Sequence, residues 1–321
     1  MGLPTAALLA LVVAYCAGTE VLTRWVLSPA STVQRTLEQE IAEAGRLRCA
    51  SPGQAKTLLV VGNSLLEAAV DFPRLNDLLK PEWSAQRLSI SDTSYLDWRF
   101  GLLRLLKSGS QPDAIALMLS PRQLVADRIR GSYSAHYMMQ VRDLGDVAKA
   151  AHLHRTEATS LLLARISLFY AIRAELHNLV LSKVFPGIED LLTLLIYTPR
   201  RPLDPELVSK TAELRLRDLN SIANEQAIPF VLLLPPALRE DGDLALVEAG
   251  CRTGVPVIRP VSSSELTPSL FRDGHHANKK GAAQYTQRLS VPLRDWLENK
   301  SVADVNGPTC RNRLQAFVAT H

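Results

Sequence analysis

The chain has 321 residues, of which 47% are hydrophobic and 21% are charged, and its formal net charge is +4. This composition is typical of a globular protein with a sizeable core, and it excludes a disordered chain and a multi-span membrane protein. The basic residues are scattered and no aromatic residues alternate with them, so nucleic-acid binding is not expected.

The N-terminus carries the apolar stretch "PTAALLALVVAYCAG", which continues weakly until Glu20 and Arg24 interrupt it. A helix needs about 20 apolar residues to span a bilayer, so three interpretations compete: a single-pass signal anchor, a cleaved signal peptide and a buried N-terminal helix. A small-x-small cleavage site is poorly formed around Tyr15 and Cys16. We therefore favour a membrane anchor over residues 1–29.

The sequence has four cysteines, and none of them belongs to a Cys-x-x-Cys pair. A zinc site built on cysteine is therefore not expected. If the body of the protein is exported, Cys49 and Cys310 could form a disulfide that ties the two ends of the chain together. Free or buried thiols are the alternative.

Beyond the anchor, residues 30–55 have the pattern of a polar connecting helix. Five short apolar runs then predict buried strands, at residues 57–61, 86–90, 113–119, 229–234 and, more weakly, 256–259. Because helical patterns lie between these runs, we expect an α/β domain over residues 56–297, with a parallel sheet and helices on both faces.

Residues from about 130 to 225 interrupt this alternation, because they contain helical patterns with no strand between them. We interpret them as a helical insertion between the third and fourth strands. Its apolar faces could pack on the body, form a lid or rest near the membrane surface, and a plain packing layer is the simplest of these. Residues 298–321 have the pattern of a C-terminal tail.

Ser64 follows the first predicted strand, in the stretch "VVGNSLLEA". Ligands of open α/β sheets bind beyond the carboxyl ends of the strands, and unpaired N–H groups at a helix start favour an alkoxide or oxyanion. Gly62 would let the backbone turn tightly before the serine. Serine is also a common helix N-cap, so this junction alone does not distinguish a nucleophile from a cap.

Asp273 and His276 lie close together in "FRDGHHANKKG". A histidine can take the proton of a serine hydroxyl near neutral pH, and an aspartate one turn away can hold its other ring nitrogen. Side chains three residues apart on a turn meet, so we expect His276 and not His275 to pair with Asp273. Metal binding by this stretch is not expected, because such closely spaced ligands cannot easily close a tetrahedral shell. A polar turn without chemistry is the other alternative.

These blocks resemble the SGNH (GDSL-like) hydrolase superfamily, over residues from about 56 to 297. "VVGNSLLEAAV" is similar to its first block in the GNS variant, and "IPFVLLLPP" resembles the strand before its final catalytic segment. "FRDGHHANKKGAAQYTQRL" is similar to its last block, in which a short polar link and a glycine follow Asp-x-x-His. The resemblance implies a three-layer α/β/α fold with a parallel, flavodoxin-like sheet. It also implies that Ser64 is the nucleophile, His276 the general base and Asp273 its orienting partner, with no cofactor and no metal.

Two blocks depart from the family's pattern at the oxyanion hole. The second block normally supplies a glycine N–H, but "SISDTSYLDW" has Ser91 and Asp92 at that place. The third normally supplies an asparagine side chain, whereas "LMLSPRQL" offers Arg122 or Gln123. These residues, with Asn63 beside the nucleophile, are the expected oxyanion and substrate residues. Losing one oxyanion donor typically costs about 100- to 1000-fold in rate. These departures therefore leave open whether the protein hydrolyses esters efficiently.

The resemblance and the anchor together imply a serine esterase or O-acyltransferase in the cell (inner) membrane, with its catalytic domain in the periplasm. This arrangement is similar to that of the alginate O-acetyltransferases and the D-alanine transfer proteins, in which a multi-span membrane partner commonly delivers the acyl group. We therefore expect acyl groups, such as acetyl, of an envelope or exported polysaccharide as the substrate. The alternatives are a free-standing carboxylesterase or lipase-like hydrolase that acts on small acyl esters, and a catalytically silent binding protein.

Overall fold

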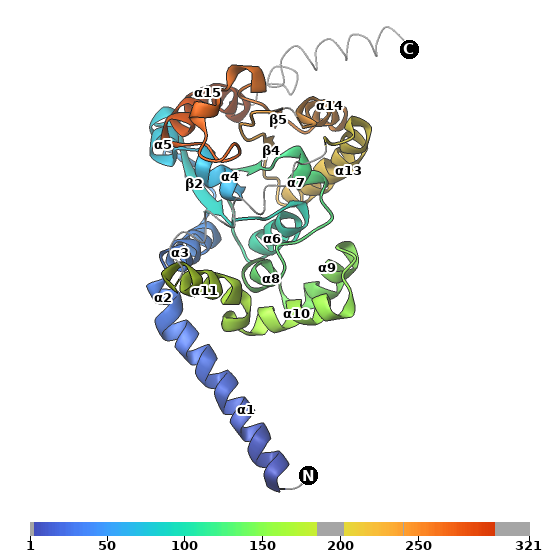
Figure 1. The fold of residues 1–321 in the computed structure, drawn as a ribbon. Helices are drawn as coiled ribbons and strands as arrows, with labels where there is room; N and C mark the ends of the chain where they lie inside the picture. Colours follow the sequence, from blue (N-terminus) through green and yellow to red (C-terminus); the bar gives the residue numbers. More distant parts are fainter. Residues whose placement is uncertain (1–2, 185–201, 240, 299–321) are drawn as a thin grey trace. The chain divides into compact units, whose positions relative to one another are not determined.

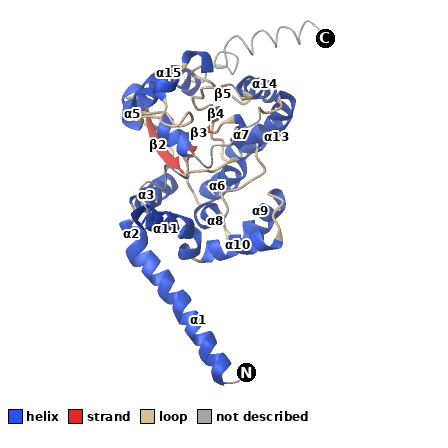
Figure 2. Ribbon diagram, viewed as in Figure 1, coloured by secondary structure: helices blue, strands red, loops and turns tan. Residues whose placement is uncertain are grey.

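The computed structural model describes residues 3–184, 202–239 and 241–298 of the chain (Figure 1). The chain forms two compact units, one of residues 1–39 and 130–201 and the other of residues 40–129 and 202–321. Every strand in the described residues belongs to the second unit (Figure 2). The two are called the helical unit and the sheet unit below.

The sheet unit is built on five parallel strands: β1 (Lys56–Gly62), β2 (Trp83–Ser89), β3 (Ala114–Met118), β4 (Phe230–Leu233) and β5 (Val257–Ile258). Their order across the sheet is β2-β1-β3-β4-β5. All five predicted strands are confirmed, as are the α/β class and the parallel sheet. The strand order reverses beside β1, and this is the kind of position at which open α/β sheets bind ligands.

The register of the three neighbouring strands brings their carboxyl ends together. Gly62 at the end of β1 pairs with Ser89 of β2 on one side and with Met118 of β3 on the other. The segments that follow these three strands therefore begin side by side at one edge of the sheet. They carry all the residues that the sequence suggested for the nucleophile and the oxyanion hole.

Both faces of the central strands are buried, as is usual for parallel strands in α/β proteins. On one face, residues such as Leu58 join a core with α4 (Ser64–Ala69), α5 (Phe72–Leu79) and α15 (Lys279–Leu297). The adjacent Leu59, whose side chain points to the opposite face, is fully buried as well. The sheet is thus a fixed platform for the segments at its edge.

Among the described residues, the sheet unit contains four further α-helices in full: α6 (Tyr95–Lys107), α7 (Pro121–Val125), α13 (Pro205–Asn224) and α14 (Asp243–Thr253). Helix α13 packs against β4 and α14, and α14 packs against β5. Within the stretch predicted as a helical insertion, 130–225, α13 therefore belongs to the sheet unit.

The helical unit contains the rest of that stretch: α8 (Ser132–Met138), α9 (Leu144–Ala150), α10 (Arg155–Ile166) and α11 (Leu168–Val184). It also contains α1 (Leu3–Leu22), which continues through the helical residues Thr23–Leu27 into α2 (Ser28–Ala30). Helix α3 (Thr32–Arg46) begins in this unit and ends in the sheet unit. It provides the polar connecting helix that was expected within residues 30–55.

The N-terminal helix is long and apolar enough to cross a membrane over Pro4–Ala30, and it is the one helix among the described residues with this property. Its most apolar part is not buried within the protein. This agrees with the predicted membrane segment and disfavours the interpretation as a buried helix, because a core helix would be covered by the rest of the chain.

The cysteines do not support the suggested pairing of the two chain ends. Cys49 is exposed and carries a free thiol, as does Cys16. Cys251, on α14, is disulfide-bonded. Cys310 and all of the predicted tail 298–321 except its first residue lie outside the described residues.

Candidate active site

Ser64 is the first residue of α4, directly beyond the end of β1. The residue that caps this helix is Asn63, whose Oδ1 accepts a hydrogen bond from the Leu65 N–H at 3.0 Å. Because the cap is supplied by its neighbour, the Ser64 hydroxyl is left available for other contacts. The interpretation of Ser64 as a simple N-cap is therefore wrong.

Gly62 serves a purpose different from the expected tight turn. Its backbone is part of β1, and a Cβ at this position would lie 3.0 Å from the carbonyl oxygen of Met118 and 2.9 Å from Cβ of Leu66. A larger residue would therefore push β3 and α4 away from β1. The glycine allows the strand and the helix that carries Ser64 to pack closely.

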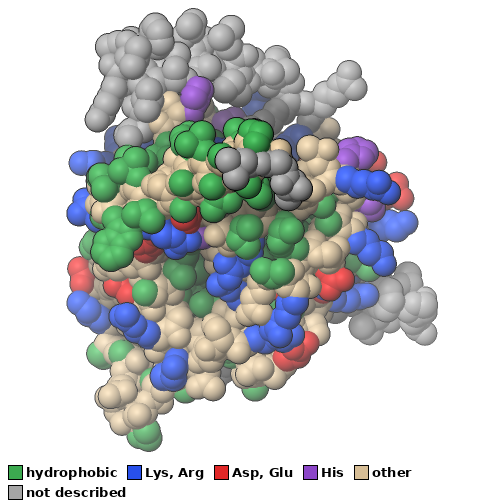
Figure 3. All heavy atoms as spheres, turned by 90° about the horizontal axis from the view of Figure 1, so that it is seen from below, with side chains coloured by type: hydrophobic (Ala, Val, Ile, Leu, Met, Phe, Trp, Pro, Cys, Tyr) green, Lys and Arg blue, Asp and Glu red, His purple; other side chains and the backbone are tan. Residues whose placement is uncertain are grey.

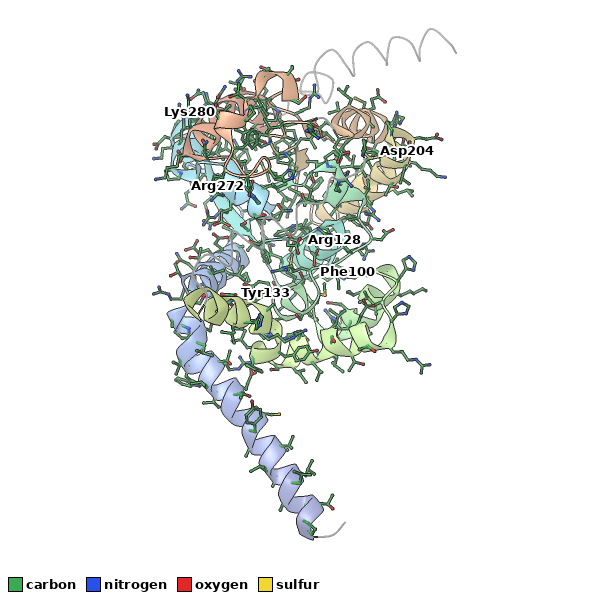
Figure 4. All side chains as sticks on the ribbon, in the orientation of Figure 1. Phe100, Arg128, Tyr133, Asp204, Arg272 and Lys280 are labelled. Carbon is green, nitrogen blue, oxygen red and sulfur yellow. The ribbon has the colours of Figure 1, made fainter. Side chains whose placement is uncertain are left out.

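The Asp-x-x-His segment is a short, hydrogen-bonded turn. Phe271 and Ala277 form an isolated antiparallel bridge, and the Arg272 N–H donates to the His276 carbonyl at 2.8 Å. Gly274 adopts a left-handed φ of 80° at the tip, which glycine accepts without steric cost. Arg272, which is labelled in Figure 4 together with Lys280, begins this segment. The turn fixes Asp273 and His276 relative to each other.

A continuous chain of hydrogen bonds joins the three predicted catalytic residues. His276 Nδ1 lies 2.7 Å from Asp273 Oδ2, and His276 Nε2 lies 3.0 Å from Ser64 Oγ. The Asp273 side chain is 44% exposed and that of His276 29% exposed, so a substrate can reach them. The structure therefore brings together all three residues that were predicted from two separate sequence blocks.

The partners of the imidazole determine its tautomer. An ionised carboxylate can only accept hydrogen bonds, so His276 Nδ1 must carry the proton that faces Asp273. In the neutral ring Nε2 is then an acceptor, and it receives its hydrogen bond from the Ser64 hydroxyl. This is the arrangement in which a histidine can remove the serine proton.

Asp273 remains ionised because of the hydrogen bonds around it. Its partial burial alone would raise the pKa, but hydrogen bonds from the backbone N–H and ring of His276 and from the His275 N–H outweigh this effect. They lower the pKa of Asp273 from 3.8 to about 2. The backbone bonds have N···O distances of 2.8 Å from His276 and 3.1 Å from His275. The carboxylate thus keeps its negative charge at all physiological pH values.

The start of α15 holds the residues that precede the turn. Asn278 caps this helix by accepting the Gly281 N–H at 3.0 Å, and its side-chain amide donates to the Ser269 carbonyl at 2.7 Å. A Cβ at Gly281 would overlap the carbonyl oxygen of Leu270. The glycine after the polar link is therefore required by the close approach of α15 to Leu270, the last residue of the 3-10 turn Pro268–Leu270.

Helix α15 is in turn fastened to the sheet. The hydroxyl of Tyr285, which is fully buried, donates to the Leu234 carbonyl at 2.7 Å, just beyond the end of β4. Thr286 accepts the backbone N–H of Asp71, the residue that caps α5, at 2.9 Å. These contacts connect the histidine-bearing segment to the same sheet that carries Ser64.

The loop after β2 contains Ser91 and Asp92, the predicted backbone donors. Both are exposed, and Asp92 adopts a left-handed φ of 61°. This is the conformation that favours glycine, which is the residue expected here from the resemblance. The Asp92 carboxylate forms an exposed ion pair with Arg128 at 3.2 Å. The backbone at Asp92 therefore has a conformation that a glycine would adopt freely.

Asn63 is not available as a side-chain donor to an oxyanion. It is fully buried, its amide donates to the Thr93 carbonyl at 2.9 Å, and its Oδ1 caps α4. Thr93 is held in turn by Trp98, whose Nε1 donates to the threonine hydroxyl at 2.9 Å. Asn63 therefore joins the loop after β2 to the start of α4. This positioning role was missed in the sequence because the contact between Asn63 and Thr93 joins residues 30 positions apart, and Trp98 contributes through Thr93.

Arg122 and Gln123, the predicted side-chain donors, are both engaged elsewhere. Arg122 is ion-paired with Asp241, with its Nε at 3.0 Å and one terminal nitrogen at 2.6 Å from the same carboxylate oxygen. Gln123 Oε1 accepts hydrogen bonds from the backbone and hydroxyl of Ser120, each at 3.0 Å, and so caps α7. The Arg122 guanidinium is therefore occupied by Asp241, whereas the hydrogen bonds at Gln123 engage the side-chain oxygen and not the amide NH₂.

The two histidines differ sharply in their surroundings. His275 is exposed, whereas both ring nitrogens of His276 have partners within the triad. Across the described ranges, no group of three or more His, Cys, Asp or Glu residues has the arrangement of a metal site.

A scan of the chain against known protein-family models found no match, and a search of curated proteins found no significantly similar relative.

Proposed function

We propose that the protein is a membrane-anchored serine esterase or O-acyltransferase of the SGNH type. Ser64 is its nucleophile, His276 its general base and Asp273 the residue that orients the base. The observation that carries this proposal is the hydrogen-bonded chain from Asp273 through His276 to Ser64 at the carboxyl edge of the sheet.

The proposal includes the three-layer α/β/α fold of the SGNH hydrolases. The strand order β2-β1-β3-β4-β5 supports it, because this is the flavodoxin-like order. The buried opposite faces of β1, represented by Leu58 and Leu59, also support it. A further support is Gly281, because its required smallness gives a physical reason for the glycine of the family's last block.

The proposed reaction has two half-reactions. His276 Nε2 takes the proton of the Ser64 hydroxyl while Ser64 Oγ attacks the ester carbonyl. The tetrahedral intermediate then expels the alcohol, which receives that proton from Nε2, and an acyl-enzyme remains. Water or a sugar hydroxyl then gives its proton to Nε2 and attacks the acyl carbon. Collapse of this second tetrahedral intermediate breaks the bond between the acyl group and Ser64 Oγ, which takes the proton back from Nε2. Asp273 stays ionised throughout and stabilises the imidazolium.

We assign the oxyanion hole to main-chain N–H groups. The N–H of Ser64 belongs to the first turn of α4, where backbone donors have no acceptor within the helix. The second donor in the proposal is the backbone of the Ser91–Asp92 loop, which Asn63 holds beside the start of α4. The ion pair of Arg122 with Asp241 favours this assignment over a donor from the Arg122 side chain.

We place the protein in the cytoplasmic membrane with its sheet unit on the outer side. The apolar helix Pro4–Ala30 supports the anchor. The disulfide-bonded Cys251 supports the location, since disulfides persist in oxidising compartments. For an enzyme held there, an acyl group on an envelope or exported polysaccharide is the substrate class that we propose. A multi-span membrane partner would supply the acyl donor if the reaction is transfer.

The test uses the full-length protein in detergent micelles and a fluorophosphonate that reacts with activated serines. We expect the wild type to be labelled between about pH 6 and 9, where a neutral histidine can act as base. Ser64→Ala should abolish labelling because it removes the nucleophile. His276→Ala should reduce it to background because the hydroxyl loses its base.

Two results would contradict the proposal. Labelling that persists in Ser64→Ala would place the reactive serine elsewhere. A wild type that is folded but unlabelled throughout this pH range would favour a binding protein without catalysis. If labelling behaves as expected, acetyl esters and acetylated oligosaccharides with added sugar acceptors would separate hydrolysis from transfer.

A further inference from the structure

The interrupted end of the N-terminal apolar run has a specific structural role. Glu20 accepts hydrogen bonds from the Ser167 hydroxyl at 2.8 Å, the Leu168 N–H at 2.9 Å and the Phe169 N–H at 3.2 Å. Its carboxylate also forms an ion pair with Arg24 at 2.6 Å. The carboxylate therefore attaches the start of α11, and with it the corner between α10 and α11, to the side of α1.

This contact lies near one end of the apolar part of the anchor helix. A helix that begins at Leu3 reaches Glu20 after about 26 Å, which is close to the far boundary of a hydrocarbon core about 30 Å thick. Trp25, whose side chain is 79% exposed, follows about 7 Å further along the axis. Exposed tryptophans next to apolar spans are typical of the membrane–water interface. Glu20 therefore lies on the lipid side of this interfacial residue.

The attached corner is itself apolar on its surface. Leu162, Leu163 and Ile166 at the end of α10 and Phe169 at the start of α11 are exposed by 43%, 40%, 60% and 37%. Leu162 and Leu163 lie four and three residues before Ile166, which places these three along one face of α10. Phe169 follows just beyond Ser167, the residue that caps the C-terminal end of α10. The first half of α10 is polar, with exposed residues from Arg155 to Thr159 apart from Ala158. The apolar surface is therefore confined to the end that Glu20 holds.

Hydrophobic side chains gather on part of the face that Figure 3 presents. Both α1 and the α10–α11 corner belong to the helical unit. Lipid explains two features of this surface together. It covers the exposed apolar residues, and its low polarity gives a reason why Glu20 is fully provided with donors, since an unpaired carboxylate there would be costly.

We propose that the α10–α11 corner inserts into the outer leaflet of the same bilayer that α1 spans. The inference rests on the anchor in the proposed function, and it makes the helical unit a second membrane contact. The apolar end of α10 would lie among the acyl chains near the headgroups, while its polar start would remain in water.

The test measures membrane depth in the full chain. Nitroxide labels are attached to single cysteines in a Cys16→Ser, Cys49→Ser background, and the protein is reconstituted in phosphatidylcholine–phosphatidylglycerol vesicles. The positions are Leu163 and Ile166 on the corner, Thr159 on the polar part of the same helix, and Val12 within α1. Collision rates with oxygen, which concentrates in lipid, and with a water-soluble nickel complex report depth.

At Leu163, Ile166 and Val12 we expect the collision rate of the label with oxygen to exceed that with the nickel complex several-fold. At Thr159 we expect the collision rate with the nickel complex to be the higher of the two. Adding Glu20→Ala should shift the ratio of the two collision rates at Ile166 toward the ratio at Thr159. The ratio at Val12 should still report lipid. An unchanged Ile166 label in that variant would overturn the role of the Glu20 contact.

Three other outcomes would overturn the inference in distinguishable ways. If Val12 reports lipid but Ile166 reports water, the corner does not insert, although the anchor stands. If both report water, the anchor fails as well, and Ser64 labelling by the fluorophosphonate still tests the active site separately. If Ile166 is shielded from both collision partners, a protein and not lipid covers the corner.

Discussion

The Nε2 atom of His276 lies 3.0 Å from the Oγ of Ser64, although 212 residues separate the two in the sequence. Two different elements create this contact. The start of α4 presents the serine, and the hydrogen-bonded turn before α15 presents the histidine. Catalysis by this pair would therefore depend on how precisely the start of α4 and the turn before α15 are held relative to each other.

Replacement of Asp273 by asparagine tests the orientation of the base. The asparagine NH₂ can donate a hydrogen bond to His276 Nδ1, which favours the tautomer that carries its ring proton on Nε2. Nε2 could then no longer accept the Ser64 proton. We expect turnover of a small acyl ester to fall by about 1,000- to 10,000-fold with the fold retained. A loss of less than about tenfold, measured by steady-state kinetics alongside circular dichroism, would show that Asp273 does not set the tautomer.

The three triad residues could be predicted because their chemistry is encoded in short stretches. A small residue and a serine after a buried strand, and an aspartate three residues before a histidine, are local patterns. The strands were equally accessible, because buried parallel strands are continuously apolar. The register that brings Ser64 to His276 follows from the strand order and from packing, which no short stretch contains.

The contacts of the expected oxyanion residues could not be predicted, for the same physical reason. Arg122 forms an ion pair with Asp241, which lies 119 residues further along the chain. No pattern in the sequence near Arg122 indicates this partner. The left-handed backbone of Asp92 also depends on its surroundings, because aspartate tolerates this conformation only somewhat better than most residues. The role of Glu20 was hidden likewise, since its partners on α11 lie almost 150 residues further along the chain.

The low pKa of Asp273 predicts a particular dependence of stability on pH. The folded-state pKa of about 2 lies below the ordinary 3.8. The ionised group therefore stabilises the fold above about pH 4, and this contribution disappears as the pH falls from about 4 to 2. Thermal unfolding of wild type and Asp273→Asn between pH 5 and 2 measures it. The difference in melting temperature should shrink as the pH approaches 2, and a constant difference would refute the assignment.

Replacement of Gly281 by alanine tests the packing behind the turn. The new Cβ would overlap the Leu270 carbonyl, so either α15 or the segment that leads to Asp273 must move. We expect a loss of about 1–3 kcal/mol in unfolding free energy. We also expect a larger proportional loss of activity than of folded protein, because the displaced segment carries His276.

A matched control is available at Gly45, near the end of α3, where a Cβ would meet open space. Alanine there should be neutral or should stabilise the protein by up to about 1 kcal/mol. Urea unfolding of both variants, combined with fluorophosphonate labelling, provides the comparison. Equal behaviour of the two variants would show that the close approach of α15 to Leu270 has no role in positioning the site.

Two replacements of Gln123 distinguish a helix cap from an oxyanion donor. Gln123→Glu keeps an oxygen that can accept the hydrogen bonds from Ser120, but it removes the side-chain amide donor. Gln123→Ala removes both. If Gln123 only caps α7, the glutamate variant should retain activity within a few-fold. The alanine variant should lose about 0.5–2 kcal/mol of stability, the typical cost of a lost cap.

A side-chain oxyanion donor gives the opposite pattern. Both variants would then lose about 100- to 1000-fold in turnover, because the amide that binds the developing negative charge is absent from each. We expect the first pattern, since the Oε1 of Gln123 is already held by Ser120 and the proposed donors are backbone N–H groups of Ser64 and the loop at Asp92. Turnover and urea unfolding of the two variants, measured on the same preparations, decide between a main-chain and a side-chain oxyanion hole.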